Sequence, residues 1–353
     1  MTTQFIGKEA LGKIITHIGL NRFAVDLSTE LTTALAEHDP QQTNVMTRHG
    51  FVYPAPQTGV LEWMPIMHAD GAILVKLVAY NPTNPARFAK PTILSTMALF
   101  DSASGSLKAL TDGVLLTAMR TGASSAIASR VLAKTDSQTV GLIGCGAQAV
   151  TQLHALSRVF SLERVLVYDT AAESAASLAH RAAFIGLPIE VVSLNTLEQD
   201  ADIICTATTV APGAGPVMTG AALKPWVHIN AVGSDLPDKT ELPLSLLKSS
   251  FICPDFPEQA VKEGECQQLP IDDVTGPSFF DLVKNQVTYQ AYKEQSTVFD
   301  STGFALADLV AVRLLCKYAD ELGLGTAVEV EATPPDPKDP YSFLTLPRML
   351  PID

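Results

Sequence analysis

The chain has 353 residues, of which 47% are hydrophobic and only 17% are charged, and its formal net charge is −13. This length suggests two domains, and the apolar fraction is ordinary for a globular protein. The acidic balance argues against a nucleic-acid surface, which needs a basic footprint, and against a polybasic membrane patch. It does not reveal the charge of a substrate, because net charge is not site charge.

The cysteines and the N-terminus indicate the compartment. The five cysteines are scattered and form no C-x-x-C pair, so we expect neither a disulfide framework nor a zinc site, and a reducing environment. No apolar run reaches the roughly 18 residues of a membrane-spanning helix. The N-terminus carries Lys8 and Glu9 instead of a signal-peptide core. We therefore expect a cytoplasmic protein without a bound metal.

The first part of the chain predicts helices, then strands, then helix again. Apolar residues at helical spacing predict helices around 11–18 and 23–35. Residues 81–91 contain three prolines and predict an irregular loop, and residues 112–132 predict one or two helices. Strand composition predicts three strands, at Gly59–Met64, Ala72–Tyr80 and Ile93–Phe100.

From Thr139 onward, short apolar strands alternate with helices. The predicted strands are Thr139–Ile143, Arg164–Tyr168, Ile189–Val192, Ile203–Thr206, Val227–Val232 and Ser250–Cys253. The predicted helices are Ala147–Phe160, Ala171–Phe184, Thr196–Asp200 and Gly303–Leu322, and the proline-rich tail after Ala332 is expected to be extended. This alternation favours a parallel sheet with helices on both faces, the α/β class.

A glycine motif follows the first of these strands. Gly144-Cys-Gly-Ala-Gln-Ala149 fits G-x-G-x-x-A: the first glycine permits a tight turn, and Gly146 lets a pyrophosphate approach the backbone at a helix N-terminus. Asp169 ends the next strand, where an acid can accept hydrogen bonds from the ribose of NAD. Nothing basic immediately follows it, which favours NAD over NADP. The alternative is an ordinary β–α turn with a capping Asp.

Several further segments carry a family resemblance. They are Asn84–Arg87, Leu116–Gly122, Gly144–Gln148, His228–Asp235, Asp238–Leu242 and Val298–Gly303. Together they resemble the ornithine cyclodeaminase/mu-crystallin family, over about residues 48–322. The resemblance implies a Rossmann NAD-binding domain, residues 123–304, and an α+β substrate-binding and dimerisation domain, residues 1–122 with 305–353. It also implies a homodimer, consistent with a first domain that has little chain to cover an exposed sheet.

Two elements point to the cyclodeaminase branch of this family. Glu62-Trp-Met-Pro65 and Glu263–Leu269 mark that branch, and the first of them, with Ala147–Arg158, favours its lysine-specific members. The implied reaction converts L-lysine to L-pipecolate and ammonia, with NAD recycled within one turnover and water excluded from the imine. Alternatives are an ornithine cyclodeaminase forming L-proline, an NAD(P)H ketimine reductase or amino-acid dehydrogenase, and a non-catalytic binding protein.

The resemblance assigns a substrate carboxylate site. Arg48 and Arg120 match carboxylate-binding arginines, whose forked guanidinium groups suit bidentate contact. Arg48 lies in a polar stretch, and without the resemblance it would be interpreted as a surface residue. Thr92 matches a further carboxylate contact. Glu62 matches an acid near the distal amine, although its flanking apolar residues also allow an outward-facing strand position.

Two residues are candidates for proton transfer. Lys76 lies inside an apolar strand, and burial would lower the pKa of its amine into a useful range. Asp235 follows the predicted strand Val227–Val232 and matches the carboxylate that accepts the proton of the amine, against the alternative of a turn-forming Asp. Which of the two is the main acceptor stays open. So does the choice between lysine and ornithine, which differ by one methylene, worth about 1–3 kcal/mol.

The remaining assignments concern the cofactor. The resemblance places Lys239 near NAD and Ser301 near the nicotinamide, whereas His154 and His228 are interpreted as core or surface histidines. The complete set of cofactor-binding residues expected from the motif and the resemblance is Thr121, Gly144, Gly146, Ala147, Gln148, Asp169, Val232, Gly233, Lys239 and Ser301.

Overall fold

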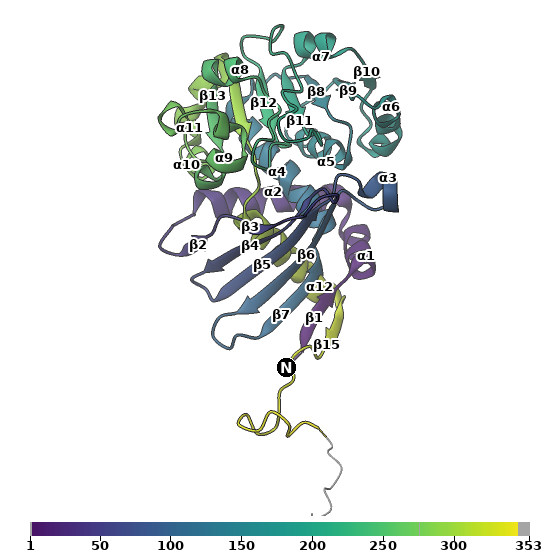
Figure 1. The fold of residues 1–353 in the computed structure, drawn as a ribbon, viewed down its shortest axis with the longest axis vertical. Helices are drawn as coiled ribbons and strands as arrows, with labels where there is room; N and C mark the ends of the chain where they lie inside the picture. The colour runs from purple at the N-terminus through teal and green to yellow at the C-terminus, as the bar shows by residue number, and fades with distance from the viewer. Residues whose placement is uncertain (1, 275, 345–353) are drawn as a thin grey trace, which may run out of the picture.

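The computed structural model describes residues 2–274 and 276–344, which form two β-sheets that share helices between them (Figure 1). The elements of the first part are β1 (Thr3–Ile6), α1 (Lys8–Ile18), α2 (Leu20–Ala36), β2 (Thr43–Val45), β3 (His49–Val52), β4 (Val60–His68), β5 (Ala72–Tyr80), α3 (Asn84–Phe88), β6 (Ile93–Asp101), β7 (Leu107–Asp112) and α4 (Val114–Leu132). The chain returns to this part with α12 (Ala305–Leu322) and β15 (Thr326–Val328).

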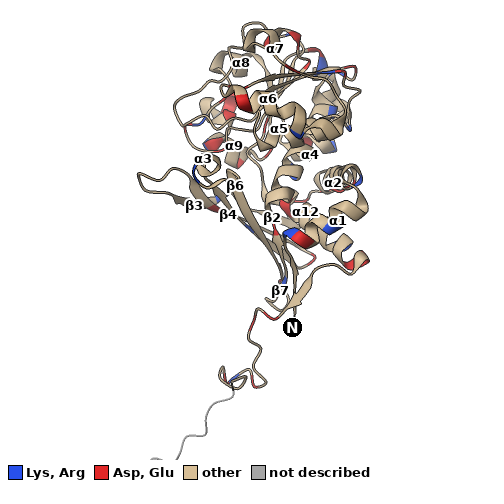
Figure 2. Ribbon diagram, turned by 90° about the vertical axis from the view of Figure 1, so that its right-hand side faces the viewer, with Lys and Arg blue, Asp and Glu red and all other residues tan. Residues whose placement is uncertain are grey.

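The first sheet is mixed and has one helix-covered face. Its strand order is β15-β1-β7-β6-β5-β4-β2, with β3 also paired to β4. Only β1 and β7 run parallel; the other neighbouring pairs are antiparallel. Helices α1, α2 and α12 lie on the same side of this sheet (Figure 2).

The second sheet is wholly parallel, as the alternation predicted. Its strands are β8 (Thr139–Ile143), β9 (Arg164–Tyr168), β10 (Ile189–Val191), β11 (Ile203–Thr206), β12 (His228–Ala231), β13 (Phe251–Pro254) and β14 (Thr297–Asp300), in the order β10-β9-β8-β11-β12-β14-β13. The helices that follow these strands include α5 (Ala147–Leu156), α6 (Ala172–Arg181), α7 (Leu194–Asp200), α8 (Leu244–Ser249), α9 (Pro257–Glu263), α10 (Phe279–Lys284) and α11 (Gln286–Tyr289).

Both faces of the parallel sheet are buried. Val165 and Val167 of β9 join the hydrophobic cluster on the side of α5 and α6, while Leu166 joins the cluster on the side of α7 and α8. The strand order reverses between β8 and β11, since the chain proceeds from β8 to β9 and β10 before returning to β11. Such a reversal leaves a crevice at the carboxyl ends of the strands, where open α/β sheets bind ligands.

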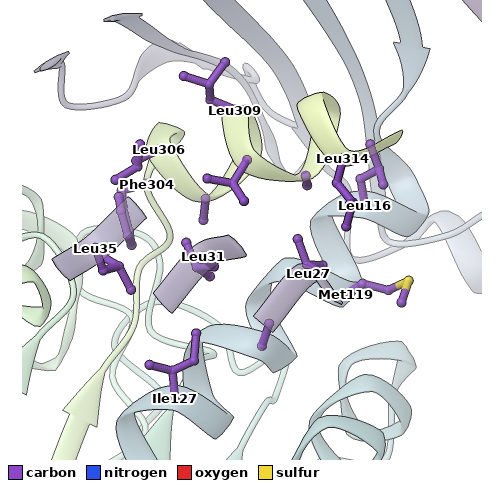
Figure 3. Close-up of a cluster of buried hydrophobic side chains, with 14 of the residues drawn as sticks. Leu27, Leu31, Leu35, Leu116, Met119, Ile127, Phe304, Leu306, Leu309 and Leu314 are labelled. Carbon is purple, nitrogen blue, oxygen red and sulfur yellow. The ribbon is translucent and has the colours of Figure 1, made fainter. Parts of the chain in front are cut away.

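A third hydrophobic cluster joins the two parts of the molecule. Leu27 and Leu31 of α2 pack with Leu116 and Ile127 of α4, and with Leu314 of α12 (Figure 3). The same cluster continues into buried aromatic residues beside the parallel sheet. Helices α4 and α12 therefore belong to one core with both sheets, which holds the space between the sheets at a fixed geometry.

The predicted fold class is confirmed, and the local errors have simple causes. The predicted loop at 81–91 contains the short helix α3, with Pro85 in its first turn, where proline is tolerated. The start of the predicted helix 112–132 is the end of β7, after which α4 is a single helix. Strands β1, β2, β3, β7, β14 and β15 were not predicted; most are too short to show an alternating pattern.

The described tail, residues 333–344, contains neither helix nor strand, and the rest of the predicted extended tail lies outside the described residues. Among the described helices, none is long and apolar enough to cross a membrane.

Candidate active site

A cavity lies between the two sheets, at the carboxyl ends of the parallel strands. It is lined from β4, β5 and α4, from the segment after β12 and from the turn before α12. The predicted site residues that line it are Arg48, Glu62, Lys76, Arg120, Thr121, Gln148, Val232, Asp235 and Ser301. The fold thus brings together residues that are separated by more than 250 positions in the chain.

The alternation of residues along β4 explains the position of Glu62. Glu62 is 9% exposed on the face that also buries Val60 and Met64, whereas Leu61 is 36% exposed on the opposite face. The outward-facing alternative for Glu62 is therefore wrong. Lys76 follows the same logic on β5: it is 1% exposed, and its neighbour Leu77 is 46% exposed.

Lys76 and Arg120 share one buried carboxylate. Asp308 of α12 places Oδ2 2.7 Å from Lys76 Nζ and Oδ1 2.9 Å from Arg120 Nε. Burial, together with the nearby Arg120 and Arg48 cations, lowers the pKa of Lys76 to about 7, although Asp308 opposes this effect. Lys76 is thus an amine whose protonation state changes near neutral pH.

Arg48 is held by two acids and by backbone carbonyls. Its guanidinium lies 2.8 Å from Glu263 Oε1 and 3.3 Å from Glu62 Oε2, and it donates to the carbonyl oxygens of Thr302 and Gly303. Its side chain is only 8% exposed, so the interpretation as a surface residue does not hold. Burial raises the pKa of Glu263 to about 7, against the opposing effect of Arg48.

Asp235 lies beyond the carboxyl end of β12 and is paired with a buried lysine. Its Oδ1 accepts a hydrogen bond from Lys239 Nζ at 2.7 Å, and the same ammonium lies 4.7 Å from the centre of the Tyr80 ring. Burial opposes the charge of Lys239, yet Asp235 raises the pKa of this lysine above its ordinary value. Lys239 is therefore a buried partner of Asp235.

The turn at residues 301–303 is fixed by Asp255. This buried carboxylate accepts hydrogen bonds from the hydroxyls of Ser301 and Thr302 and from the backbone N–H of Gly303. Gly303 has φ +83, and a Cβ there would lie 2.5 Å from Arg120 Nη1. The missing side chain is what allows the guanidinium of Arg120 to lie against the backbone.

The glycine motif lies at the strand-order reversal. Gly144 adopts φ +91, and a Cβ on it would meet the carbonyl oxygen of Ala207, which follows β11, at 2.6 Å. Gly146 precedes the first turn of α5, and nothing lies within 4 Å of where its Cβ would be. Open space beside backbone N–H groups at a helix N-terminus is what a pyrophosphate needs.

Asp169 lies next to this turn. Its carboxylate accepts hydrogen bonds from the backbone N–H groups of Cys145 and Ala171, which leaves further lone pairs for a ribose. Arg181 of α6 donates to the carbonyl oxygens of Cys145 and Gly146. The sequence places nothing basic directly after Asp169, but the fold brings this arginine to the turn.

Some predicted residues lie outside the cavity lining. Gly144, Gly146, Ala147 and Asp169 form the glycine turn and its surroundings, and Lys239 lies behind Asp235. Gly233 donates its N–H to the buried Glu241, which also binds Thr206 and Thr208. Thr92 is not a lining residue; its carbonyl oxygen accepts a hydrogen bond from Asn81.

Sequence reasoning missed the acids that hold the cations. In the sequence analysis, no role is given to Asp308 and Glu263, which pair with buried cations, or to Asp255, which binds the turn at residues 301–303, although Glu263 lies in one of the motifs. The available signal was the burial context: Asp308 is the single charge in Ala305-Leu-Ala-Asp-Leu-Val-Ala-Val312, and such a residue inside an apolar helix requires a partner. Among the described residues, no cluster of His, Cys, Asp and Glu is arranged to hold a metal ion.

Comparisons with known proteins agree with this arrangement. The chain is 44% identical to the L-lysine cyclodeaminase of Streptomyces rapamycinicus over 97% of this chain and 100% of that protein. A solved structure concerning recognition of L-lysine, L-ornithine and L-2,4-diaminobutyric acid by lysine cyclodeaminase superposes with a TM-score of 0.94, at 45% identity, covering 97% of this chain and 99% of that one.

A more distant solved structure is an archaeal alanine dehydrogenase dimer with bound NAD. It gives a TM-score of 0.81 at 26% identity and covers 94% of this chain and 100% of the other. The fold and the site define an α/β protein of the dinucleotide-binding type, with a substrate cavity between two sheets. Residues 11–321 match the ornithine cyclodeaminase/mu-crystallin family, and the chain belongs to that family.

We expect Gly303→Ala to displace Arg120 from Asp308, because the new Cβ would overlap the guanidinium. The matched control is Gly105→Ala, which has a similar φ of +72 but nothing within 4 Å of the new Cβ. Urea unfolding should show a loss of about 1–3 kcal/mol for Gly303→Ala beyond that of the control, as is typical of overpacking. Equal losses would mean that only backbone strain matters at Gly303.

Proposed function

We propose that the protein is an NAD-dependent cyclodeaminase that converts a basic L-amino acid, L-lysine in the first place, to a cyclic secondary amino acid and ammonia. The proposal rests on one cavity next to the glycine turn. Its lining offers cationic side chains that can bind the carboxylate of an amino acid and acidic side chains that can bind its two amines. Identity of 44% to an L-lysine cyclodeaminase supports the choice of lysine and of L-pipecolate as the product.

The proposed NAD site uses the glycine turn. Gly144, Gly146 and Ala147 would hold the pyrophosphate, and Asp169 would accept hydrogen bonds from the ribose. Bound NAD would supply a hydride acceptor that becomes the hydride donor later in the same turnover, so no net redox change results. Thr121, Gln148, Val232, Gly233, Lys239 and Ser301 are the residues proposed to contact the cofactor nearer the cavity.

The proposed carboxylate contacts are Arg120, Lys76 and Arg48. The three cations line the cavity, and each already has an acidic partner, so none is an uncompensated buried charge. A carboxylate entering between them gains charge-assisted hydrogen bonds and fixes the orientation of the Cα–H bond. Glu62 would bind the distal ammonium of the substrate. Its contact to Arg48 is long, at 3.3 Å, so the carboxylate can exchange this contact for the ammonium.

Asp235 is proposed to remove the proton from the reacting amine. Lys239 donates a hydrogen bond to its Oδ1, which orients the carboxylate while its second oxygen can face the substrate. The cavity wall between the charged groups is apolar, with Val60, Met64, Val78 and Ile93 lining it. Such a wall accommodates a methylene chain and limits access of water to the imine.

The direct test incubates the protein with NAD⁺ and, separately, L-lysine and L-ornithine, followed by identification of the products. We expect pipecolate from lysine with a higher kcat/KM than proline from ornithine, at substoichiometric NAD⁺ and without accumulation of NADH. One NADH per product would indicate a dehydrogenase instead. A preference for ornithine would move the protein to the proline-forming branch, and no turnover of either would indicate a binding protein.

Replacing Asp235 by Asn should reduce kcat/KM for cyclisation at least about 10²-fold, a typical contribution of a general base. Asparagine keeps the size of the side chain but cannot accept the proton of the amine. Asp238→Asn is the control, since Asp238 is exposed in the same segment and its positive φ suits Asn. If Asp235→Asn kept both its NAD affinity and its kcat/KM, Asp235 would have no catalytic role and would serve only the structure of the turn.

We further propose that residues 1–122 with 305–353 form the substrate-binding and dimerisation unit and that residues 123–304 form the NAD-binding unit. The separate membership of strands β1–β7 and β8–β14 in two sheets supports this division. A cytoplasmic location is proposed because all five cysteines are unpaired, as is usual in a reducing compartment.

A homodimer is proposed from the outer face of the first sheet. Phe51, Leu61, Met67 and Leu77 each expose at least a third of their surface there, on neighbouring strands, and the opposite face is the one that packs on helices (Figure 2). Contiguous apolar surface of this kind marks an interaction site. The dimeric archaeal relative supports a second copy of the chain as the occupant.

Light scattering at micromolar concentration should give the mass of a dimer or of a larger assembly of dimers. Leu77→Lys should shift it towards the monomer, because a charge in the centre of an apolar interface loses its hydration. Val287→Lys, at an 83% exposed position of α11, should leave the mass unchanged. A monomeric wild-type chain would contradict the proposal.

A further inference from the structure

Asp308 lies where three parts of the cavity meet. It belongs to the first turn of α12, is 0% exposed, and contacts Lys76 of β5 through one oxygen and Arg120 of α4 through the other. No residue of the proposed mechanism has two cationic partners of this kind. The carboxylate itself does not line the cavity, whereas both of its partners do.

The two cations come from separate elements and repel each other. Arg120 lies close enough to disfavour the charged form of Lys76. A shared acid between them removes this repulsion and fixes the distance between the ammonium and the guanidinium. Asp308 lies in the first turn of an 18-residue helix, where an acidic side chain suits the partial positive charge of the helix N-terminal end.

The arrangement leaves donor groups free on the cavity side. Asp308 uses only Nε of Arg120, and the Nη1 and Nη2 atoms lie against the backbone of Gly303 beside the cavity. Lys76 has three donors, of which Asp308 can take one. An acid that binds both cations from behind orients the remaining donors towards the same space, which is the geometry needed for one planar carboxylate.

We propose that Asp308 is a positioning residue that holds Lys76 protonated and aligns it with Arg120, so that both receive the substrate carboxylate together. This inference rests on the proposed function, because it takes Lys76 and Arg120 as substrate contacts. It adds a residue that acts without touching the substrate. Asp308 then determines over which pH range the carboxylate site is intact.

The sign of the pH effect follows from the surroundings of Lys76. The charged groups that act on it most strongly are Asp308 on α12, Arg120 on α4 and Arg48 before β3. Glu62 on β4 and Asp235 after β12 line the same cavity, and the strand neighbours Met64 and Met97 carry no charge. Asp308 is the acid in direct contact with the ammonium, at 2.7 Å. Its neutralisation must therefore lower the pKa of Lys76 further, and the substrate site must fail at lower pH than in the wild type.

The experiment compares pH profiles of kcat/KM for L-lysine, which report ionisations of the free enzyme. In Asp308→Asn we expect the basic limb to move to lower pH by at least about one unit, with a loss of at least about tenfold at pH 7.5. Asp308→Glu keeps the negative charge, so the basic limb of its kcat/KM profile should stay at the wild-type pH. The control Asp320→Asn, at an exposed position of the same helix, should keep the wild-type profile.

A second readout does not depend on turnover. In protein labelled with ¹³C at lysine Cε, the resonance absent from Lys76→Met reports the titration of Lys76. Its midpoint should fall in Asp308→Asn and stay in Asp308→Glu and Asp320→Asn. Asp308→Ser, which leaves space for a water between the cations, provides a second neutral variant if the asparagine variant does not fold.

The outcomes separate this inference from the proposed function. If the wild type turns over lysine but the limb and the Lys76 titration are unchanged in a folded neutral variant, the role of Asp308 is wrong. An equal loss at every pH, or failure of both neutral variants to fold while Asp308→Glu folds, also overturns it, since the acid then serves only stability. If the wild type turns over neither lysine nor ornithine, the proposed function fails, while the Lys76 titration still tests the pairing.

Discussion

Buried charge has to be compensated, and this requirement organises the space between the two sheets. Arg48, Lys76, Arg120 and Lys239 have side chains that are at most 8% exposed, and each lies within 3 Å of a carboxylate oxygen. An unpaired ion there would cost several kcal/mol of desolvation. The acids come from α9, α12 and the segment after β12, so the pairs connect elements that are remote in the chain. The cavity is thus assembled by electrostatics as much as by the hydrophobic core.

Two strands of the first sheet each place one charged residue on an otherwise apolar inner face and a leucine on the outer face. On β4 and β5 the charged residues Glu62 and Lys76 are buried, whereas Leu61 and Leu77 are exposed. A strand whose polar residues point inward must find its ion pairs inside, and one whose leucines point outward loses hydrophobic stabilisation unless something covers them. The inner ion pairs and the proposed dimer face are therefore two consequences of one pattern: the alternation of residues along these strands.

How far the sequence predicts the structure depends on whether the signal is local. The parallel sheet could be predicted because its strands are apolar runs that alternate with helices, and Gly144 and Asp169 could be located because their spacing reflects one β–α–β unit. The family resemblance supplied Lys76, Arg120 and Asp235 as candidates, and the structure brings these three residues together in one cavity. The acid opposite Lys76 and Arg120 could not be assigned, since pairing across 188 or more residues, as between Arg120 and Asp308, leaves no periodic trace in the chain.

The chain crosses between the two sheets twice, and both crossings carry site residues. It leaves the first sheet through α4, which holds Arg120, and returns through α12, which holds Asp308 and starts at the turn that binds Arg48. Many nucleotide-dependent enzymes can be thought of as interchangeable modules joined by linkers. Here the linkers contribute residues to the candidate site, so recombination of one half with a foreign partner would separate the proposed substrate contacts from each other. A change of substrate specificity would therefore have to come from substitutions of single residues that line the cavity, while the arrangement of the two sheets and their connecting helices stays the same.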